Sequence, residues 1–323
     1  MMSARIRVHK TLIAGLLACM SLFAINDALA RNIRFYVVVA PGGSVDGMAR
    51  IVSDKFGPLV DATVIVENKP GGGGNVASQL VAKSAPDGNS LLVSANNHTL
   101  NPFLFKDPGY QMKDLIPIAE LMRGPSVIVV PANSPYTSLA QLIEDAKSRP
   151  GAIPFGAAGI GTPSHIAAEL LLLSAGIKME AIQYRGSGPS LGDLVGGQIP
   201  VASSSLVAAM PMIKAGKLRA LAVTSAKRWP GAEQIPTAAE FGMPDYEHVT
   251  WIGLFAPKGT PQAVLAQYGS AVKQALANPE VQRRVAGLGG EVGTLEGEAF
   301  EKFILEDAEE AAKIVKLSGM KAD

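Results

Sequence analysis

A strand that passes through a glycine-rich turn into a well-delimited helix occupies residues 153–176, and it limits the fold of this chain more than any other stretch. Ile153 to Ala157 is a short apolar run, typical of a buried strand. Thr162 suits the N-cap of the helix that follows, Pro163 suits its first position, and Gly176 suits its end. A strand, a turn and a helix in this order form the repeating unit of an α/β fold.

The start of this helix is a candidate anion site. Amide N–H groups in the first turn of a helix lack intrahelical partners and carry a positive partial charge, so a carboxylate or phosphate can be bound there without a lysine. Gly159 and Gly161 let the backbone come close to a ligand, and Thr162, Ser164 and His165 would add side-chain donors. The alternative interpretation is a turn that only caps its own helix.

A second unit of the same kind lies near the start of the chain. Residues 33–40 are typical of a buried strand, and a helix is expected over 45–59, with Ser44 suited to its N-cap. Asp46 falls in the first turn, where a carboxylate stabilises the helix dipole. The backbone donors expected at this second turn are Gly42, Gly43, Ser44, Val45 and Asp46. Neither turn contains a lysine or arginine, so we expect the backbone of both turns to hold one ligand carboxylate.

Short strands and helices alternate through the rest of the chain. Further strands are expected over 63–67, 90–95, 116–121, 126–130, 180–184, 199–202, 220–224 and 249–256, and further helices over 75–83, 138–147, 261–278, 279–288 and 295–317, with two more ending near 194 and 215. Polar residues follow the strands expected over 90–95 and 199–202, and ligands usually bind α/β sheets at the ends of strands. This adds Asn97, His98 and Ser204 as candidates, and Arg185 is expected to shape the far end of the pocket.

Two crossings of the chain, near Val130 and near Trp251, predict a discontinuous first domain. We expect an α/β protein with residues 31–130 and 253–323 in one domain, residues 131–252 in the other, and a ligand cleft between them. Pro131 to Pro135 and the segment around Trp251 are the expected hinges.

Residues 1–30 have the pattern of a secretory signal peptide. A basic beginning is followed by an apolar run over 11–25, which is too short to span a membrane, and Ala28-Leu29-Ala30 supplies a cleavage pattern. This predicts a periplasmic protein that begins near Arg31. The alternative is a lipoprotein box at 16–19, in which Cys19 would carry a lipid anchor.

Removal of this leader would leave a chain without cysteine, since Cys19 is the only one in the sequence. Disulfides and thiol chemistry are then excluded. The leader contains Arg5, Arg7, Lys10 and one acid, Asp27, so the remaining chain is close to neutral. Its charge therefore gives no reason to expect nucleic acid or an anionic membrane surface as a partner.

Nine motifs follow one another in order: 37–50 (VVVAPGGSVDGMAR), 67–75 (ENKPGGGGN), 85–88 (APDG), 101–102 (NP), 157–165 (AAGIGTPSH), 184–189 (YRGSGP), 194–198 (LVGGQ), 213–225 (IKAGKLRALAVTS) and 251–261 (WIGLFAPKGTP). Together they resemble the Bug family of extracytoplasmic solute receptors, which are binding subunits associated with tripartite tricarboxylate transporters. The resemblance covers nearly all of the mature chain.

The resemblance implies a type II periplasmic binding protein, a two-domain clamp of the Venus flytrap kind that binds a small organic carboxylate. Its partner would be a permease of the tripartite tricarboxylate type or a sensor kinase, and the receptor itself would be a monomer without cofactor or metal. Two departures concern the ligand. Ser44-Val45-Asp46 stands where such receptors usually have Gly-Thr-Asp, and Ser203 to Ser205 stand near a common acidic pair, which makes an amino-acid ligand less expected.

The alternative function is a secreted hydrolase acting on a small carboxylate-containing substrate, because the chain is rich in serine and contains His98, His165 and His248. Ser164 and His165 are sequence neighbours that diverge around a helix, and no His-Glu-x-x-His pair occurs. We therefore expect a receptor, and we name no catalytic residue.

Overall fold

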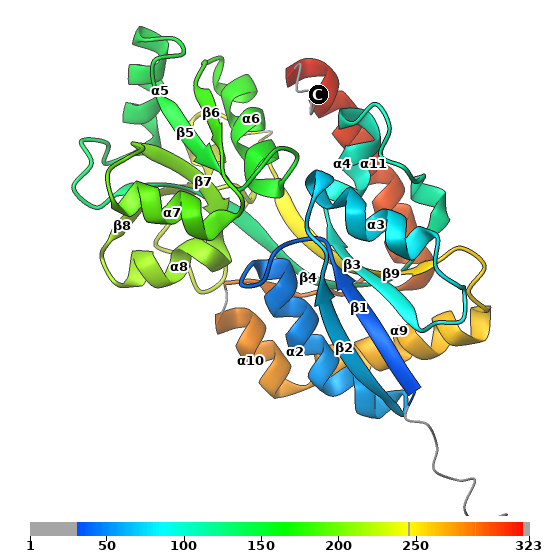
Figure 1. Ribbon diagram of the computed structural model, residues 1–323. Coiled ribbons are helices and arrows are strands. Elements are labelled where there is room, and N and C mark those ends of the chain that lie inside the picture. Colours follow the sequence, from blue (N-terminus) through cyan, green and yellow to red (C-terminus); the bar gives the residue numbers. More distant parts are fainter. Residues whose placement is uncertain (1–30, 245, 288, 319–323) are drawn as a thin grey trace, which may run out of the picture.

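The computed structural model describes residues 31–244, 246–287 and 289–318, which form two α/β lobes joined by long strands (Figure 1). The expected signal peptide and Cys19 lie outside the described residues. Within the described ranges, no helix has a stretch both long and apolar enough to cross a membrane. The expected α/β class is confirmed, with parallel and antiparallel strands in one mixed sheet system.

The first lobe is built on parallel strands that are completed by antiparallel ones. Its strands are β1 (Arg31–Val37), β2 (Ala62–Asn68), β3 (Ser90–Ala95), β9 (Val249–Pro257), the short β10 (Glu291–Val292) and the first part of β4 (Leu115–Pro131). Its helices are α2 (Ser44–Leu59), α3 (Asn75–Ala82), α4 (Asn97–Leu104), α9 (Gln262–Ala277), α10 (Pro279–Gly287) and α11 (Gly297–Ser318), with 3-10 turns η1 (Gly72–Gly74) and η2 (Met112–Asp114). The largest core lies here and includes Phe35, Phe56, Trp251 and Phe255.

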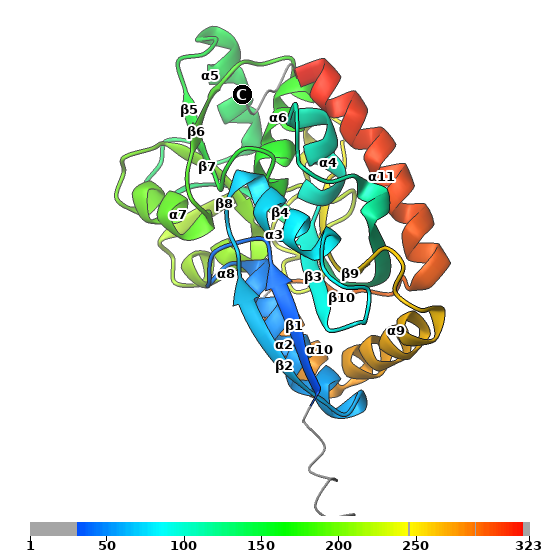
Figure 2. The same cartoon turned by 45° about the vertical axis from the view of Figure 1, so that its right-hand side comes forward.

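The second lobe has a smaller sheet with apolar packing on both faces. Its strands are β5 (Pro154–Ala157), β6 (Glu180–Gln183), β7 (Val201–Ser205), β8 (Leu218–Val223) and the last part of β4. Its helices are α5 (Leu139–Ser148), α6 (Pro163–Ala175), α7 (Ser187–Val195) and α8 (Leu206–Lys214), with the 3-10 turn η3 (Ala238–Phe241). Residues of α5 and α6 pack on one side of the sheet and residues of α7 and α8 on the other, as Figure 2 helps to show.

The chain crosses between the lobes inside a continuous strand. Leu115 to Pro125 of β4 pair with β9, whereas Ser126 to Pro131 pair with β7 and β8. The two strands expected over 116–121 and 126–130 are therefore one, and the crossing lies at Pro125 and Ser126. The expected hinge at Pro131 to Pro135 is wrong, because Pro131 already pairs with Leu218 in the second lobe.

The return crossing lies just before β9. The His248 N–H donates to the Thr224 carbonyl at 2.8 Å in the second lobe, and Val249 pairs with Pro125. The two crossing segments are thus neighbours in the sheet, which is the arrangement that lets two lobes rotate about one line.

Candidate ligand-binding site

The turn between β1 and α2 presents a helix start without a side-chain cap. Gly43 is the N-cap in an extended conformation, and no side chain bonds to the first-turn amides. The Gly42 N–H is already engaged, because it donates to the Asp46 carboxylate at 3.0 Å. The amides that remain available to a ligand are therefore those from Gly43 to Asp46.

Asp46 holds this turn in shape rather than facing a ligand. Its carboxylate, almost fully buried, accepts hydrogen bonds from the Gly42 N–H, from Asn68 at 2.9 Å and from Arg50 at 3.1 Å. Burial would raise the pKa of Asp46, but hydrogen bonds from Arg50, Gly42 and Asn68, together with the charge of Arg50, lower it. The carboxylate is ionised and fully occupied within its own lobe.

The turn between β5 and α6 is held by neutral groups. The Thr162 hydroxyl donates to the Gly159 carbonyl at 2.7 Å, and Ser164 Oγ accepts from the Ala158 N–H at 3.3 Å. The Gly161 N–H donates to Nδ1 of His165 at 3.3 Å, so this nitrogen carries no proton. Among the donors expected here, the Gly161 amide and the Thr162 hydroxyl are already in use. The first-turn amides of the helix, at Ser164 and His165, remain available.

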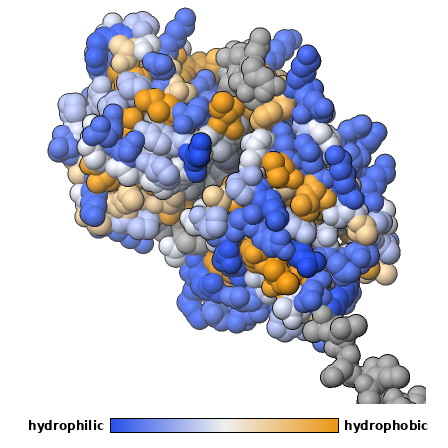
Figure 3. All heavy atoms as spheres, in the orientation of Figure 1, coloured by the Kyte–Doolittle hydropathy of each residue, from blue (hydrophilic) through white to orange (hydrophobic). Residues whose placement is uncertain are grey.

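The two turns lie at the border between the lobes (Figure 1), and the surface between the lobes is hollowed (Figure 3). The second turn also touches the first lobe. A Cβ built on Gly161, whose φ is +72°, would lie 2.8 Å from Cδ1 of Leu104 and 3.4 Å from Cδ2 of Leu100, both on α4. A glycine is needed at this position both for its backbone conformation and for the close approach of α4.

Helix α4 occupies residues that were expected only as the polar end of a strand. The Asn97 side chain accepts from the Ala95 N–H at 3.2 Å and donates to the Gly73 carbonyl at 2.9 Å. Asn101 donates to the same carbonyl at 3.0 Å. The side-chain amides of Asn97 and Asn101 thus hold the run of four glycines at 71–74 in place. Both residues therefore stabilise the fold of this lobe.

His98 faces the core of the first lobe instead of the cleft. Its ring lies 4.5 Å from the ring of Phe255 and is stacked near Tyr110, and its Nδ1 has no hydrogen-bond partner among the described residues. Burial lowers the pKa of His98 to about 4, so the ring is neutral. The expectation that His98 binds ligand does not agree with this placement.

Arg185 and Ser204 differ in what they offer. Arg185 is exposed on the loop between β6 and α7 and forms no ion pair with any described residue. Ser204 is fully buried at the end of β7, and its hydroxyl has no hydrogen-bond partner within the described ranges. Of these two side chains, only Arg185 is accessible to a ligand.

The sequence contains one motif that would favour the hydrolase alternative. Residues 188–192 read Gly-Pro-Ser-Leu-Gly, which matches the Gly-x-Ser-x-Gly pattern of a nucleophile elbow. The structure places Ser190 within α7 and buries it completely. A nucleophile elbow must expose its serine on a sharp turn between a strand and a helix, so Ser190 does not fit that role.

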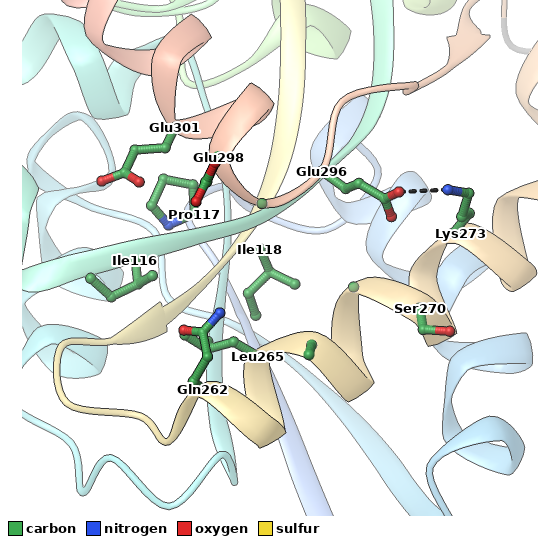
Figure 4. A pocket seen from close by; sticks show the side chains of 13 residues that line it. Ile116, Pro117, Ile118, Gln262, Leu265, Ser270, Lys273, Glu296, Glu298 and Glu301 are labelled. Atoms are coloured by element: carbon green, nitrogen blue, oxygen red, sulfur yellow. Dashed lines mark hydrogen bonds and ion pairs between the residues drawn. The ribbon is translucent and has the colours of Figure 1, made fainter.

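A separate groove of about 530 Å³ lies on the first lobe (Figure 4), and no residue of either turn lines it. Ile116, Ile118 and Leu265 form its apolar part, and the Lys273–Glu296 ion pair at 2.6 Å crosses its edge. The groove belongs to one lobe only and contains none of the expected site residues. Among the described residues, no cluster of three or more His, Cys, Asp or Glu side chains is suited to a metal ion.

Comparisons with known proteins point to one family. The sequence profile described as "Tripartite tricarboxylate transporter family receptor" matches residues 48–320. The chain is 38% identical over 262 residues to the "UPF0065 protein in tcbD-tcbE intergenic region" of Pseudomonas sp. (strain P51), covering 80% of this chain and 78% of that protein. It is 32% identical over 295 residues to BugT of Bordetella pertussis, covering 90% of each chain.

Solved structures agree with this. An R. palustris protein with adipate superposes with a TM-score of 0.86 at 30% identity, covering 91% of this chain and 99% of that one. BugD, a periplasmic binding protein, gives a TM-score of 0.83 at 32% identity, covering 90% and 98%. MatC from Rhodopseudomonas palustris, with bound malate, gives 0.82 at 28% identity, covering 88% and 99%.

Proposed function

This chain belongs to the tripartite tricarboxylate transporter receptor family, whose members are solute receptors and not enzymes, and we propose that it captures a small dicarboxylate between its two lobes. The observation that carries the proposal is the pair of helix starts at the border of the lobes, each without a side-chain cap. Dicarboxylates occupy two similar proteins, one with adipate and one with malate.

The near carboxylate would be held by backbone amides. Those of Gly43 to Asp46 come from the first lobe, and those of Ser164 and His165 come from the second. The Ser44 hydroxyl, for which no hydrogen bond is seen among the described residues, would add a donor. Because each turn is already ordered within its own lobe, binding does not have to order the donors of either turn.

The far carboxylate would pair with Arg185. Its guanidinium is exposed at the end of β6 without an acidic partner in the described parts of the chain, so an incoming carboxylate would not have to displace one. Asn97, His98 and Ser204 are left out of the proposed site, because the first two serve the fold of the first lobe and the third is fully buried.

The receptor would work in the periplasm as a monomer, after export and cleavage near Arg31, and would deliver its ligand to a permease of the tripartite tricarboxylate type or report it to a sensor kinase. Intact-mass analysis of exported protein tests the processing. A mature species that begins at an acylated Cys19 would instead support the lipoprotein alternative.

The test of ligand class is thermal unfolding with malate, adipate, citrate and butyrate, followed by calorimetry on the best binder. A ligand that binds only the folded state raises the free energy of unfolding by about 2.7 kcal/mol at one hundred times its dissociation constant. We expect a dicarboxylate to give the largest increase. Binding of none of these acids would contradict the proposal.

Arg185→Gln tests the far end of the ligand. It should weaken binding of the dicarboxylate about tenfold and leave binding of its monoamide unchanged, because the amide has no charge to pair. Lys178→Gln is the matched control, since Lys178 is also exposed but precedes β6, at the opposite end of the strand from Arg185. Equal losses for the acid and its monoamide would show that Arg185 does not read the far carboxylate.

A further inference from the structure

An apolar cluster joins the two lobes independently of their separate cores. Leu100 and Leu104 come from α4, Ala311 and Ile314 from α11, and Ile166 from α6, and all five are buried. α4 and α11 belong to the first lobe, whereas α6 belongs to the second. We call these five residues the interlobe cluster. α6 lies beside α4 and α11 in both Figure 1 and Figure 2, and α11 is in contact with each of the other two helices.

Helix α11 is fixed to the first lobe before it reaches this cluster. Phe300 and Ile304 are buried in the first-lobe core, and Asp307 accepts a hydrogen bond from the Thr99 hydroxyl of α4. Ile314 is therefore held in a defined place relative to α4. Only the α6 side of the interlobe cluster can separate when the lobes rotate about the crossings at Pro125 and Val249.

The cluster also lies directly under one of the two candidate ligand turns. A Cβ on Gly161 would clash with the side chain of Leu104 and touch that of Leu100, and Ile166 lies in the first turns of the helix that begins after Thr162. The position of the α6 start relative to the first lobe is thus set by apolar contacts that lie outside the ligand cleft.

We propose that the interlobe cluster positions the α6 start for ligand capture and stabilises the closed clamp without touching the ligand. Opening would expose Ile166, Leu100 and Ile314 to water, which disfavours the open form. The apparent affinity of a clamp equals its intrinsic affinity multiplied by the fraction of molecules that are closed. The cluster therefore raises affinity by raising that fraction. This inference rests on the proposed ligand cleft for its effect on binding, but not for its effect on the ligand-free clamp.

The test compares two isoleucines of the same helix. Ile314→Ala removes contact from the interlobe cluster, whereas Ile304→Ala removes a similar side chain from the first-lobe core. Residues 31–323 contain no cysteine, so spin labels can be placed in a protein of these residues through Lys83→Cys in the first lobe and Lys178→Cys in the second, both exposed. The distance distribution is measured without ligand and with the dicarboxylate found by the thermal screen.

We expect Ile314→Ala to shift the ligand-free distances toward the open form, to weaken binding about tenfold and to place most of that loss in the dissociation rate. Ile304→Ala should lower the melting temperature while leaving the distances and the affinity as in wild type. Ile314→Val, which keeps most of the apolar contact and perturbs folding less, should restore most of both properties.

Identical distance distributions in wild type and Ile314→Ala would overturn the inference, as would an equal shift in Ile304→Ala. The ligand-free measurement separates this inference from the proposed function. If no carboxylate binds but Ile314→Ala still opens the clamp, the proposed function fails and the role of the interlobe cluster stands.

Discussion

The two helix starts at the border of the lobes offer similar backbone amides, but different side-chain interactions hold them in place. The α2 start is braced by a buried charge, since Asp46 gathers Gly42, Arg50 and Asn68 around one carboxylate. The α6 start is held by a histidine ring and two hydroxyls, and its Gly161 lies close against the side chain of Leu104 in the other lobe. One start is complete within its own lobe, and the other is completed by contact between lobes.

Because of this difference, changes at the two starts should affect folding stability and closure of the lobes to different degrees. Breaking the α2 start should affect the first lobe whether the clamp is open or closed, because all of its partners are local. Breaking the α6 start should also disturb the packing of the lobes against each other. Under the proposed function, one half of the anion site would be permanently formed and closure would bring the other half to it.

The largest difference is expected between valine substitutions at Gly161 and Gly43. Gly161→Val forces a β-branched residue to a φ of +72° and against Leu104, so we expect a loss of about 2 to 4 kcal/mol of stability together with loss of binding. Gly43 has an extended backbone, and a Cβ there would meet its nearest neighbour at an ordinary 3.6 Å. Gly43→Val should therefore abolish binding by blocking the ligand while changing stability by less than about 1 kcal/mol.

Thermal unfolding and calorimetry on both variants check this. Wild-type affinity in Gly43→Val would show that the ligand does not approach the α2 start. Unchanged stability in Gly161→Val would show that the contact with Leu104 can relax, and the contrast between the two starts would disappear.

The second largest difference concerns side chains that brace each turn. Asp46→Ala leaves the Gly42 N–H and the Asn68 amide without their acceptor and should cost about 1 to 3 kcal/mol of stability. The Arg50 ion pair contributes little to this, because Arg50 is half exposed to solvent. Glu169→Gln is the corresponding change at α6, where the His165–Glu169 contact is long at 3.5 Å, and it should cost less than about 0.5 kcal/mol. Equal losses in chemical denaturation would contradict the view that only the α2 start depends on a charge.

Local signals account for most of the fold and for the existence of both helix starts. β3 has the bounds expected from the sequence, and α6 begins where Thr162 and Pro163 predicted. Such elements are encoded by neighbouring residues. Helix α4 was missed because its first turn is held by Asn97 bonding to Gly73, a contact between segments far apart in sequence.

The same limit applies to the site. The sequence identified the turns at Gly42 and Gly161, but not that the amides of both glycines are already bonded within their own turns. It also could not show that His98 turns into the aromatic core, since that depends on where β9 places Phe255. Positions of chemically suitable residues can be predicted from local pattern, whereas the direction of their side chains depends on tertiary packing.

Acid should affect the two starts differently, with a smaller effect than the substitutions above. The folded-state pKa of Asp46 is lowered below its ordinary 3.8, so the stability it contributes is present above that value and is lost as the pH falls through the lowered pKa. Urea unfolding between about pH 6 and about pH 3 should show a steeper fall in wild type than in Asp46→Asn, which cannot titrate at this position. Parallel curves for the two proteins would show that Asp46 has no special part in acid sensitivity.

The smallest expected effects distinguish the hydroxyls of the two starts. The Thr162 hydroxyl already donates its single proton to Gly159, so Thr162→Val should cost about 1 kcal/mol of stability and little affinity. The Ser44 hydroxyl has no hydrogen bond among the described residues, so Ser44→Ala should leave stability unchanged and weaken binding by about 1 kcal/mol, because only the ligand uses it. Calorimetry and thermal unfolding on both variants separate these outcomes. If Thr162→Val loses affinity and Ser44→Ala loses none, the Thr162 proton must turn from Gly159 to the ligand on closure. The α6 start would then rearrange when it binds, and the α2 start would bind through its backbone alone.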